Sequence, residues 1–370
     1  MKKIVNLSII LISLIILELF SQLLLLTLGE KKYSILVQPF INSAQQTFFP
    51  DEYKINWDFA KNKMIPGIYE NEEIQYTINS KGFRGKEFKT FKEKYRIICF
   101  GGSSTIGLKS PDDQTYPAIL EKKLNDKSNK YEVLNFGFGS KSLNFIKSLF
   151  FREAVNYKPD AISIYSNRNS IMYDSGKVDI QLISNHKFLK LNFFLMENIM
   201  TYRVVSKTYK RLYNLTLNQK FINNPYSNTK LSEKYFINGY INSLKEIIDY
   251  SNLNKIDVYL IKQAYYFNPK ISFELEKYDI QDLISKLENN FLMKNYGVNE
   301  TEQFWLITGT ILNKNLDHFK DYSNVTIVDP LKALLSDKDN FIDYIHLTPK
   351  GNEILAKEIF REISKKLKNY

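Results

Sequence analysis

Five short apolar runs divide the chain, and stretches of helical character separate them. The runs are YRIICF (95–100), YEVLNF (131–136), DAISIYS (160–166), KIDVYLIKQ (255–263) and NVTIVD (324–329). Short apolar runs bounded by polar turns predict buried strands, and strands that alternate with helices predict a parallel sheet with helices on both faces. We therefore predict an α/β fold, a three-layer sandwich around a central five-stranded parallel sheet. Its active residues should lie at the carboxyl ends of the strands.

The helical stretches and the remaining segments set the expected domain organisation. The sequence predicts helices over 112–124, 143–157 and 351–370. A long stretch rich in Tyr, Asn and Lys at about 171–255 is interpreted as a helical lid inserted into the catalytic domain. The expected domains are an anchor (1–30), a membrane-proximal lead-in (31–94) and the catalytic domain with its lid (95–370).

The amino terminus is the most apolar part of the chain. Residues 4–28 are almost continuously apolar, and roughly 20 such residues cross a bilayer as a helix. No convincing cleavage site follows, which favours a retained anchor over a signal peptide. Lys2 and Lys3 precede this segment, so we expect the catalytic domain outside the cytoplasm. Glu18, within the segment, is expected to be protonated, to snorkel or to face a partner helix.

Composition narrows the classes of function. The formal net charge is +11, but the lysines are spread along the whole chain and do not form the Arg-rich, aromatic-interleaved pattern of a nucleic-acid groove. We expect no nucleic-acid partner, and interpret the charge as a surface near anionic lipid or glycan. With one cysteine (Cys99, in an apolar run) and three histidines, we expect neither a protein-built metal site nor a cofactor.

A small-residue loop follows the first predicted strand. In GGSS (101–104) the hydroxyl of Ser103 would project from a tight turn, with its own backbone N–H free to donate. Small-residue turns with serine are common, so this loop alone is a weak signal. Gly102 and Gly107 also have the spacing of a phosphate-binding loop, but the inserted Leu108 would displace the following lysine. Nucleotide binding is therefore disfavoured.

A second candidate lies near the carboxyl terminus, where Asp343 precedes His346 by three residues ahead of a helix opened by Thr348 and Pro349. A serine hydroxyl becomes a good nucleophile when a base accepts its proton, and an acidic neighbour orients that base. Ser103, His346 and Asp343 are thus a candidate catalytic triad. An isolated D-x-x-H match is more often an ordinary surface or capping histidine.

Together these motifs resemble the SGNH (GDSL-like) hydrolases, whose first block is G-D-S or G-G-S after the first strand and whose last is D-x-x-H. The resemblance implies the flavodoxin-like form of the sandwich. It also implies an oxyanion hole from the backbone N–H of Ser103, the N–H of Gly139 in NFGFGSKS, and the side-chain amide of Asn169 in YSNRNS. The loop after Asn135, in NFGFGSKS, is one residue shorter than is usual in the family, and N-R-N-S (167–170) stands where the family has G-x-N-D. Ser140 and Asn167 therefore remain alternatives.

NSKGFRGKEF (79–88), IICFGGSST (97–105) and TYPAILEKKL (115–124) look like the membrane-anchored branch of that family, which is linked with acylation or deacylation of cell-surface glycans. The composition, rich in Lys, Ile and Asn, suggests a bacterial source. The resemblance implies ester, especially acetyl ester, chemistry on an envelope glycan or lipid, and a membrane acyltransferase as the partner class. Water as acceptor makes an esterase, and a glycan hydroxyl makes an O-acyltransferase. A catalytically silent assembly protein or glycan-binding module is the rival. Gly82 and Arg84 either support the site or form a structural turn, and the turn is the favoured interpretation.

Overall fold

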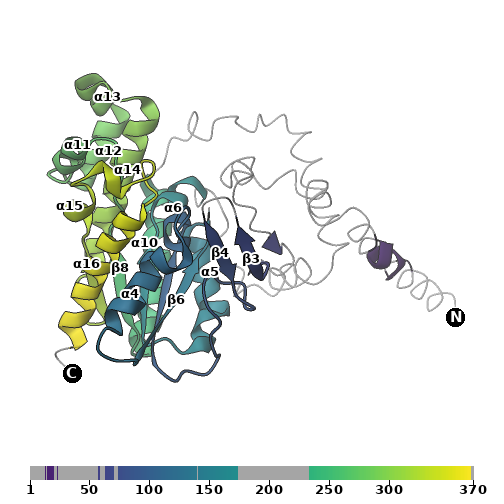
Figure 1. Cartoon of the computed structure of the whole chain (residues 1–370). Helices are drawn as coiled ribbons and strands as arrows, with labels where there is room; N and C mark the ends of the chain where they lie inside the picture. Colours follow the sequence, from purple (N-terminus) through teal and green to yellow (C-terminus); the bar gives the residue numbers. More distant parts are fainter. Residues whose placement is uncertain are drawn as a thin grey trace. The chain divides into compact units, whose positions relative to one another are not determined.

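The computed structural model describes residues 57–58, 63–70, 74–139, 141–173 and 233–367, together with positions 13, 15–20 and 23 (Figure 1). The chain divides into two compact units. One comprises Met1–Ile65 and Val178–Asn224, and the other comprises Pro66–Lys177 and Pro225–Tyr370. All five strands of the central sheet belong to the second unit.

Little of the first unit falls within the described residues. It contains the two-residue strands β1 (Trp57–Asp58) and β2 (Lys63–Met64), which pair antiparallel. Residues 15–20 are helical. None of the helices in the described ranges combines the length and the apolar character needed to cross a membrane. The expected anchor at 4–28 lies mostly outside the described residues.

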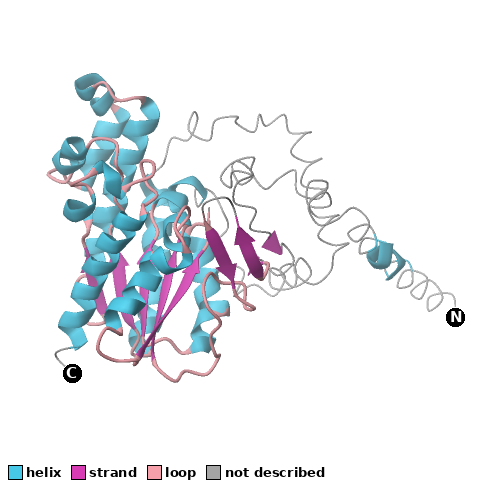
Figure 2. Cartoon of the chain, viewed as in Figure 1, coloured by secondary structure: helices cyan, strands magenta, loops and turns pink. Residues whose placement is uncertain are grey.

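The central sheet has five parallel strands, as predicted, and their order is β6-β5-β7-β8-β9 (Figure 2). The strands are β5 (Tyr95–Gly101), β6 (Tyr131–Gly137), β7 (Ala161–Tyr165), β8 (Asp257–Ile261) and β9 (Val325–Val328). The order reverses between β5 and β7, because the chain leaves β5 towards β6 and then returns to the other side of β5. In open α/β sheets, ligands bind at the carboxyl ends of strands beside such a reversal.

Helices cover both faces of this sheet (Figure 1). The helices α4 (Tyr116–Leu124) and α16 (Pro349–Leu367) pack on one face, and α5 (Leu143–Arg152) and α10 (Glu233–Leu253) pack on the other. The predicted helices at 112–124, 143–157 and 351–370 are therefore present, with their bounds shifted by a few residues.

Alternation along β5 explains why both faces of the sheet are apolar. Successive side chains of a strand point to opposite faces. Ile97 and Cys99 join the core cluster that includes Leu120 of α4. The ring centroid of Phe100 lies 6.1 Å from that of Phe150 in α5 and 5.7 Å from that of Phe136. Because Ile97, Cys99 and Phe100 are fully buried, β5 reads as a continuous apolar run in the sequence.

Two expected boundaries differ from the structure. Within the expected lid, residues 233–253 form α10, which packs on the sheet through the fully buried Leu244, Ile247 and Ile248. This part is a layer of the sandwich, and residues 174–232 lie outside the described ranges. At the other boundary, residues from 66 onwards, expected as lead-in, belong to the same compact unit as the sheet. They form the antiparallel hairpin of β3 (Gly67–Glu70) and β4 (Gln75–Ile78).

A run of four helices between β8 and β9 was not anticipated. These are α11 (Pro269–Leu275), α12 (Ile280–Glu288), α13 (Phe291–Tyr296) and α14 (Glu300–Asn315). In Figures 1 and 2 the strands point upward, and these helices rise past their carboxyl ends. The buried face of α14 includes the polar residues Thr308, Thr310 and Asn313. Polar residues on a buried face weaken the apolar periodicity by which a helix is recognised.

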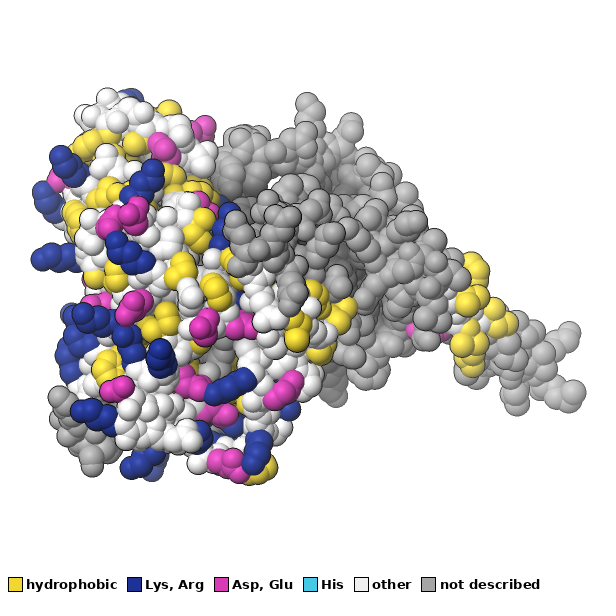
Figure 3. All heavy atoms as spheres, viewed as in Figure 1, with side chains coloured by type: hydrophobic (Ala, Val, Ile, Leu, Met, Phe, Trp, Pro, Cys, Tyr) yellow, Lys and Arg dark blue, Asp and Glu magenta, His cyan; other side chains and the backbone are white. Residues whose placement is uncertain are grey.

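The other helices are short. They are α3 (Ser103–Ile106), α6 (Arg168–Tyr173) and α15 (Leu331–Leu334), with 3-10 turns at Asp112–Gln114, Ala154–Tyr157, Leu316–Phe319 and Lys338–Asn340. On the face shown in Figure 3, lysine and arginine side chains are scattered among acidic ones. The positive charge on that face is therefore dispersed over the surface.

Candidate active site

Ser103 lies at the carboxyl edge of the sheet, where β5 ends at Gly101 and α3 begins. This turn has no room for larger residues. A Cβ on Gly101 would lie 2.4 Å from the carbonyl oxygen of Tyr165, and a Cβ on Gly137 would lie 2.1 Å from the backbone nitrogen of Ile106. Glycine at these positions lets β5, β6 and α3 approach closely. The turn thus holds Ser103 beside the reversal in strand order.

Three side chains meet at this edge. The Oγ of Ser103 lies 2.8 Å from Nε2 of His346, although 243 positions separate the residues. On the other side of the ring, Nδ1 lies 2.6 Å from Oδ2 of Asp343. An ionised carboxylate can only accept hydrogen bonds, so Nδ1 carries the ring proton and Nε2 is left to accept the proton of Ser103. The arrangement suits transfer of a proton from the hydroxyl to the imidazole.

The carboxylate of Asp343 is held by its own loop. Its Oδ1 accepts hydrogen bonds of 2.8 Å from the backbone N–H groups of Ile345 and His346. Partial burial raises the pKa of Asp343, but the hydrogen bond and the charge of His346, together with the two backbone N–H groups, outweigh it and lower the pKa to about 2. Asp343 therefore stays ionised at any pH at which the imidazole can work as a base.

The loop that carries these two residues is closed on itself and tied to the loop after β5. Phe341 and Leu347 form an antiparallel bridge, and the N–H of Ile342 donates to the carbonyl of His346 at 2.8 Å. The hydroxyl of Ser104 donates to the carbonyl of Ile345 at 3.3 Å. The position of the imidazole is therefore coupled directly to the turn that carries the nucleophile.

Asn169 follows β7 and lies against the same turn. Its Nδ2 donates to the carbonyl of Lys141 at 3.0 Å, and a Cβ on Gly102 would lie 2.6 Å from that nitrogen. As the first residue of α3, Ser103 has no acceptor within the helix for its backbone N–H. Gly139 lies in the buried turn after β6, and Ser140 lies outside the described residues. The structure thus brings Ser103 and Asn169 together at one edge.

Asn167, the alternative to Asn169, points into the core. Its Nδ2 donates to the carbonyl of Gly309 and to Oδ1 of Asn313, each at 3.1 Å, and its Oδ1 accepts from the hydroxyl of Tyr265 at 2.9 Å. These bonds occupy both ends of the amide. Asn167 is 2% exposed, and its side chain joins the loop after β7 to α14.

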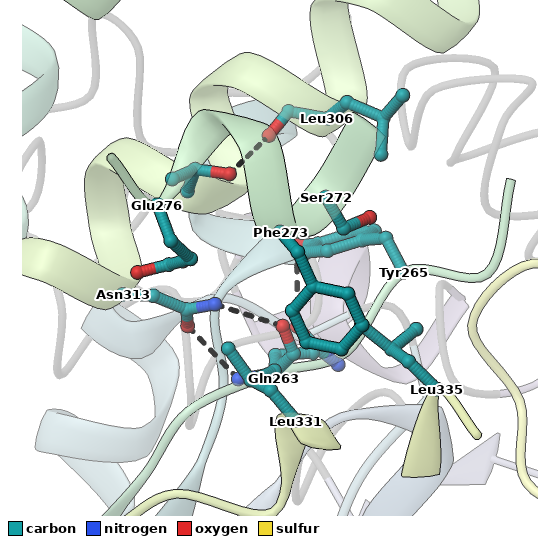
Figure 4. Close-up of a pocket in the computed structure, with 10 residues that line it drawn as sticks. Gln263, Tyr265, Ser272, Phe273, Glu276, Leu306, Asn313, Leu331 and Leu335 are labelled. Carbon is teal, nitrogen blue, oxygen red and sulfur yellow. Dashed lines mark hydrogen bonds between the residues drawn. The ribbon is translucent and has the colours of Figure 1, made fainter. Parts of the chain in front are cut away.

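A small cavity borders this buried network (Figure 4). Asn313 of α14 bonds both backbone groups of Gln263, accepting from its N–H and donating to its carbonyl at 2.9 Å each. The cavity beside them has a volume of about 20 Å³, which is room for one water molecule. Its lining comprises Gln263, Tyr265, Ser272, Phe273, Glu276, Leu306, Thr310, Asn313, Leu331 and Leu335, so no triad residue takes part.

Other residues around the site escaped the sequence analysis. The guanidinium carbon of Arg168 lies 4.6 Å from the ring centroid of Trp305 and 4.8 Å from that of Tyr344. Tyr344 in turn stacks on Phe267 at 4.6 Å. These contacts join the loops after β7 and β8 to the loop of Asp343. In the sequence, the only signal for them is that Arg168 directly precedes Asn169. Among the described residues, no three His, Cys, Asp or Glu side chains are placed to hold a metal ion.

Comparison with known proteins finds likeness in structure alone. No model of a protein family matches the sequence, and no curated protein matches it. The structure is similar to a protein of the G-D-S-L lipolytic family from Desulfitobacterium hafniense (10% identity, TM-score 0.41, 72% of this chain and 99% of that one). It is similar to a lipase/acylhydrolase from Enterococcus faecalis (14%, TM-score 0.41, 73% and 96%). It is also similar to a variant of an acetyl-xylooligosaccharide esterase from a Geobacillus species (14%, TM-score 0.40, 73% and 94%).

Proposed function

We propose that this chain is a serine hydrolase of the SGNH type that acts on ester-linked acyl groups. The observation that carries the proposal is the continuous pair of hydrogen bonds from Ser103 to His346 and from His346 to Asp343, at 2.8 and 2.6 Å. This is the geometry that activates a serine hydroxyl at neutral pH. The catalytically silent rival has no need to keep all three side chains in contact.

The reaction follows from this geometry. The Oγ of Ser103 attacks the ester carbonyl as Nε2 of His346 accepts its proton, and the resulting charge on the imidazolium is stabilised by Asp343. The backbone N–H groups of Ser103 and Gly139 and the amide of Asn169 donate to the oxyanion. When the tetrahedral intermediate collapses, His346 protonates the leaving alcohol and an acyl-serine remains. The hydroxyl of the acceptor, water or an alcohol, then attacks the acyl carbonyl as His346 accepts its proton. The bond between the acyl carbon and Oγ breaks as His346 returns that proton to Ser103.

The nature of the substrate extends the proposal further. We infer an acyl, chiefly acetyl, ester of a bacterial cell-envelope glycan or lipid, because the apolar segment 4–28 predicts a single-pass membrane protein with its catalytic domain outside the cytoplasm. With water as acceptor the protein is an esterase. With a glycan hydroxyl as acceptor it is an O-acyltransferase that uses the same acyl-serine, with a membrane acyltransferase as its partner.

The test of the chemistry is labelling by a fluorophosphonate, which reacts with activated serines. The purified protein should be labelled at Ser103, and the Ser103→Ala variant should not be labelled at all. Hydrolysis of p-nitrophenyl acetate should follow the same pattern. If the protein of natural sequence neither reacts with the probe nor hydrolyses the ester, the silent or glycan-binding alternative is correct.

The test of the substrate uses the envelope polysaccharide of the host. Acetate released from the polysaccharide by the protein of natural sequence, and not by Ser103→Ala, identifies an esterase. Transfer of a labelled acetyl group to deacetylated polysaccharide, with no excess release into water, identifies the transferase. If neither acetate release nor acetyl transfer is observed, the glycan is ruled out as the substrate, and the proposed acyl-serine chemistry is unaffected.

A further inference from the structure

Arg84 reaches the nucleophile loop from outside the sheet. It lies in the turn GFRG (82–85) after β4, and its side chain is 1% exposed. Its guanidinium donates to the carbonyls of Ile106, Gly107 and Ser110 at 2.7, 2.6 and 2.6 Å. Its Nε donates to Oδ1 of Asp112 at 2.8 Å. One buried side chain therefore binds three carbonyls of a five-residue stretch, together with a carboxylate.

The stretch that Arg84 binds is the carboxyl end of α3, the helix that Ser103 begins. With only four residues, α3 is too short to be stable on its own. It ends at Gly107 with φ 80°, and Lys109 has φ 64°, a left-handed conformation that costs energy in a residue other than glycine. Contacts with other parts of the chain must therefore hold this conformation, and Arg84 supplies three hydrogen bonds to it.

Further bonds fix the same loop on either side of Arg84. The hydroxyl of Tyr76 in β4 accepts from the N–H of Lys109 at 2.8 Å, and the Tyr76 ring lies 4.1 Å from the guanidinium carbon. On the opposite side, the hydroxyl of Ser110 accepts from Nδ2 of Asn352 in α16 at 2.9 Å. That helix follows directly after the loop of His346. The loop after α3 is thus bonded both to Arg84 and to the helix that follows the loop of His346.

We propose that Arg84 is a positioning residue for the nucleophile. By holding the carboxyl end of α3, it keeps the hydroxyl of Ser103, at the amino end of the same helix, within hydrogen-bonding distance of His346. The inference rests on the proposed serine chemistry. It also assigns a role to the segment before β5, which supports the active site through Arg84 and Tyr76 from the β3–β4 region.

The chain offers a matched control in Arg96. Its side chain is likewise 1% exposed and is paired with Glu132 at 2.6 Å. Its guanidinium donates to the carbonyls of Thr90, Tyr157 and Lys89 at 3.1, 2.8 and 2.8 Å. Arg96 lies near the amino end of β5, however, at the edge of the sheet away from Ser103. The two arginines match in burial and bonding, and differ in the end of the sheet that they support.

The experiment compares Arg84→Lys with Arg96→Lys in the full chain, with ester hydrolysis and fluorophosphonate labelling measured well below each variant's Tm. A lysine keeps the charge but cannot span three carbonyls and a carboxylate. Arg84→Lys should lower kcat and the labelling rate at least about tenfold, because small displacements of reacting atoms cost one to two orders of magnitude, with KM within about twofold. Arg96→Lys should lower Tm to a similar degree and leave kcat within about twofold.

A gentler variant covers the case in which Arg84→Lys does not fold. Tyr76→Phe removes only the hydroxyl that accepts from Lys109, and should lower kcat about threefold to tenfold at unchanged KM. The inference is overturned if every folded variant of Arg84 and Tyr76 has the kcat of the natural protein. It is also overturned if Arg96→Lys loses as much kcat as Arg84→Lys. Loss of the proposed function has a different signature, since the natural protein itself would then fail to react at Ser103.

Discussion

At the scale of single residues, Asp343 shows how one carboxylate serves two purposes. One oxygen accepts from Nδ1 of His346, and the other accepts from two backbone N–H groups of its own loop. The first bond selects the ring tautomer that leaves Nε2 free to accept a proton, and the second set holds the carboxylate still. The catalytic roles stay a prediction, and the geometry makes them testable one residue at a time.

Replacement of Asp343 by asparagine should separate orientation from charge. The amide can donate to Nδ1 and so favour the wrong tautomer, and we expect kcat to fall by about two to four orders of magnitude with little change in KM. Asp337→Asn is the control, since that carboxylate pairs with Lys350 at 2.6 Å on the surface and should leave kcat unchanged. Steady-state hydrolysis of an activated ester measures both, and a natural kcat in Asp343→Asn would refute the assigned role.

The same residue predicts how stability depends on pH. The pKa of Asp343 is lowered from 3.8 to about 2 in the folded protein, so the ionised form stabilises the fold above pH 4. This contribution is lost as the pH falls towards 2. We expect the Tm difference between the natural protein and Asp343→Asn to shrink as the pH falls from about 4 towards 2. The effect should be small, because the side chain is 44% exposed. Thermal melts across this range measure it, and a gap that widens in acid would contradict it.

Asn169 and Asn167 should respond differently to the same substitution. Asn169→Ala removes an amide that lies over Gly102 beside Ser103, and kcat should fall about 10²-fold to 10³-fold with Tm nearly unchanged. Asn167→Ala removes the hydrogen bonds of the Asn167 amide to the carbonyl of Gly309, to Oδ1 of Asn313 and from the hydroxyl of Tyr265, which should cost about 1–3 kcal/mol of unfolding free energy. Urea unfolding and kcat should be measured on both. Exchanged phenotypes would show that Asn167 is the oxyanion donor.

At the scale of elements, hydrogen bonds join the loops that meet at the carboxyl edge to one another and to neighbouring helices. Asn169 bonds the loop after β6, and the hydroxyl of Ser170 accepts from the N–H of Leu143 at 3.0 Å at the start of α5. Asn313 of α14 bonds the loop after β8 through Gln263. Each loop that contributes to the site therefore has its conformation set by a neighbouring element.

Two helix glycines test the packing of α14 against these loops. A Cβ on Gly309 would lie 2.4 Å from the ring of Tyr265, whereas a Cβ on Gly239 in α10 meets nothing within 4 Å. Gly239→Ala should stabilise the protein by about 0.5–1 kcal/mol through helix propensity. Gly309→Ala should destabilise it by about 1–3 kcal/mol, because the buried ring must move. Urea unfolding measures both, and stabilisation by Gly309→Ala would show that α14 does not press on Tyr265.

At the scale of the whole molecule, the expected membrane anchor belongs to a different compact unit from the central sheet. The compact unit that contains the central sheet begins at Pro66, and the apolar segment at 4–28 lies mostly outside the described residues. The proposed location therefore rests on hydropathy and on the lysines that precede the segment.

Protease treatment of intact cells with a permeable outer layer tests this topology. Residues beyond about 35 should be digested, because the catalytic unit is expected outside the cytoplasm, while the segment at 4–28 should stay protected by lipid. A cytoplasmic protein of the same cells should remain intact as the control. Full protection of the catalytic unit would place it in the cytoplasm and remove envelope glycans as substrates.

The sequence predicted the parts of the fold that depend on local pattern. The five strands and the parallel sheet were predicted because apolar runs and the helices between them are properties of neighbouring residues. The boundaries of the lid and lead-in were less predictable. Residues 233–253 look like any amphipathic helix, and only packing decides whether such a helix covers a sheet or a binding site. The polar face of α14 concealed a buried helix for the same reason.

By itself, the sequence determined which residues could do chemistry. Ser103 after a glycine turn, and Asp343 three positions before His346, were identified from residue types and spacing. The tertiary structure decided that these groups meet, because Ser103 and His346 lie 243 positions apart in the sequence and only the folded sheet brings them together. It also decided that Asn167 belongs to the core, and that Arg84 donates to the carbonyls of the loop that follows Ser103. The partners of Arg84 are mainly backbone carbonyls, which every residue carries, so no sequence pattern could have revealed them.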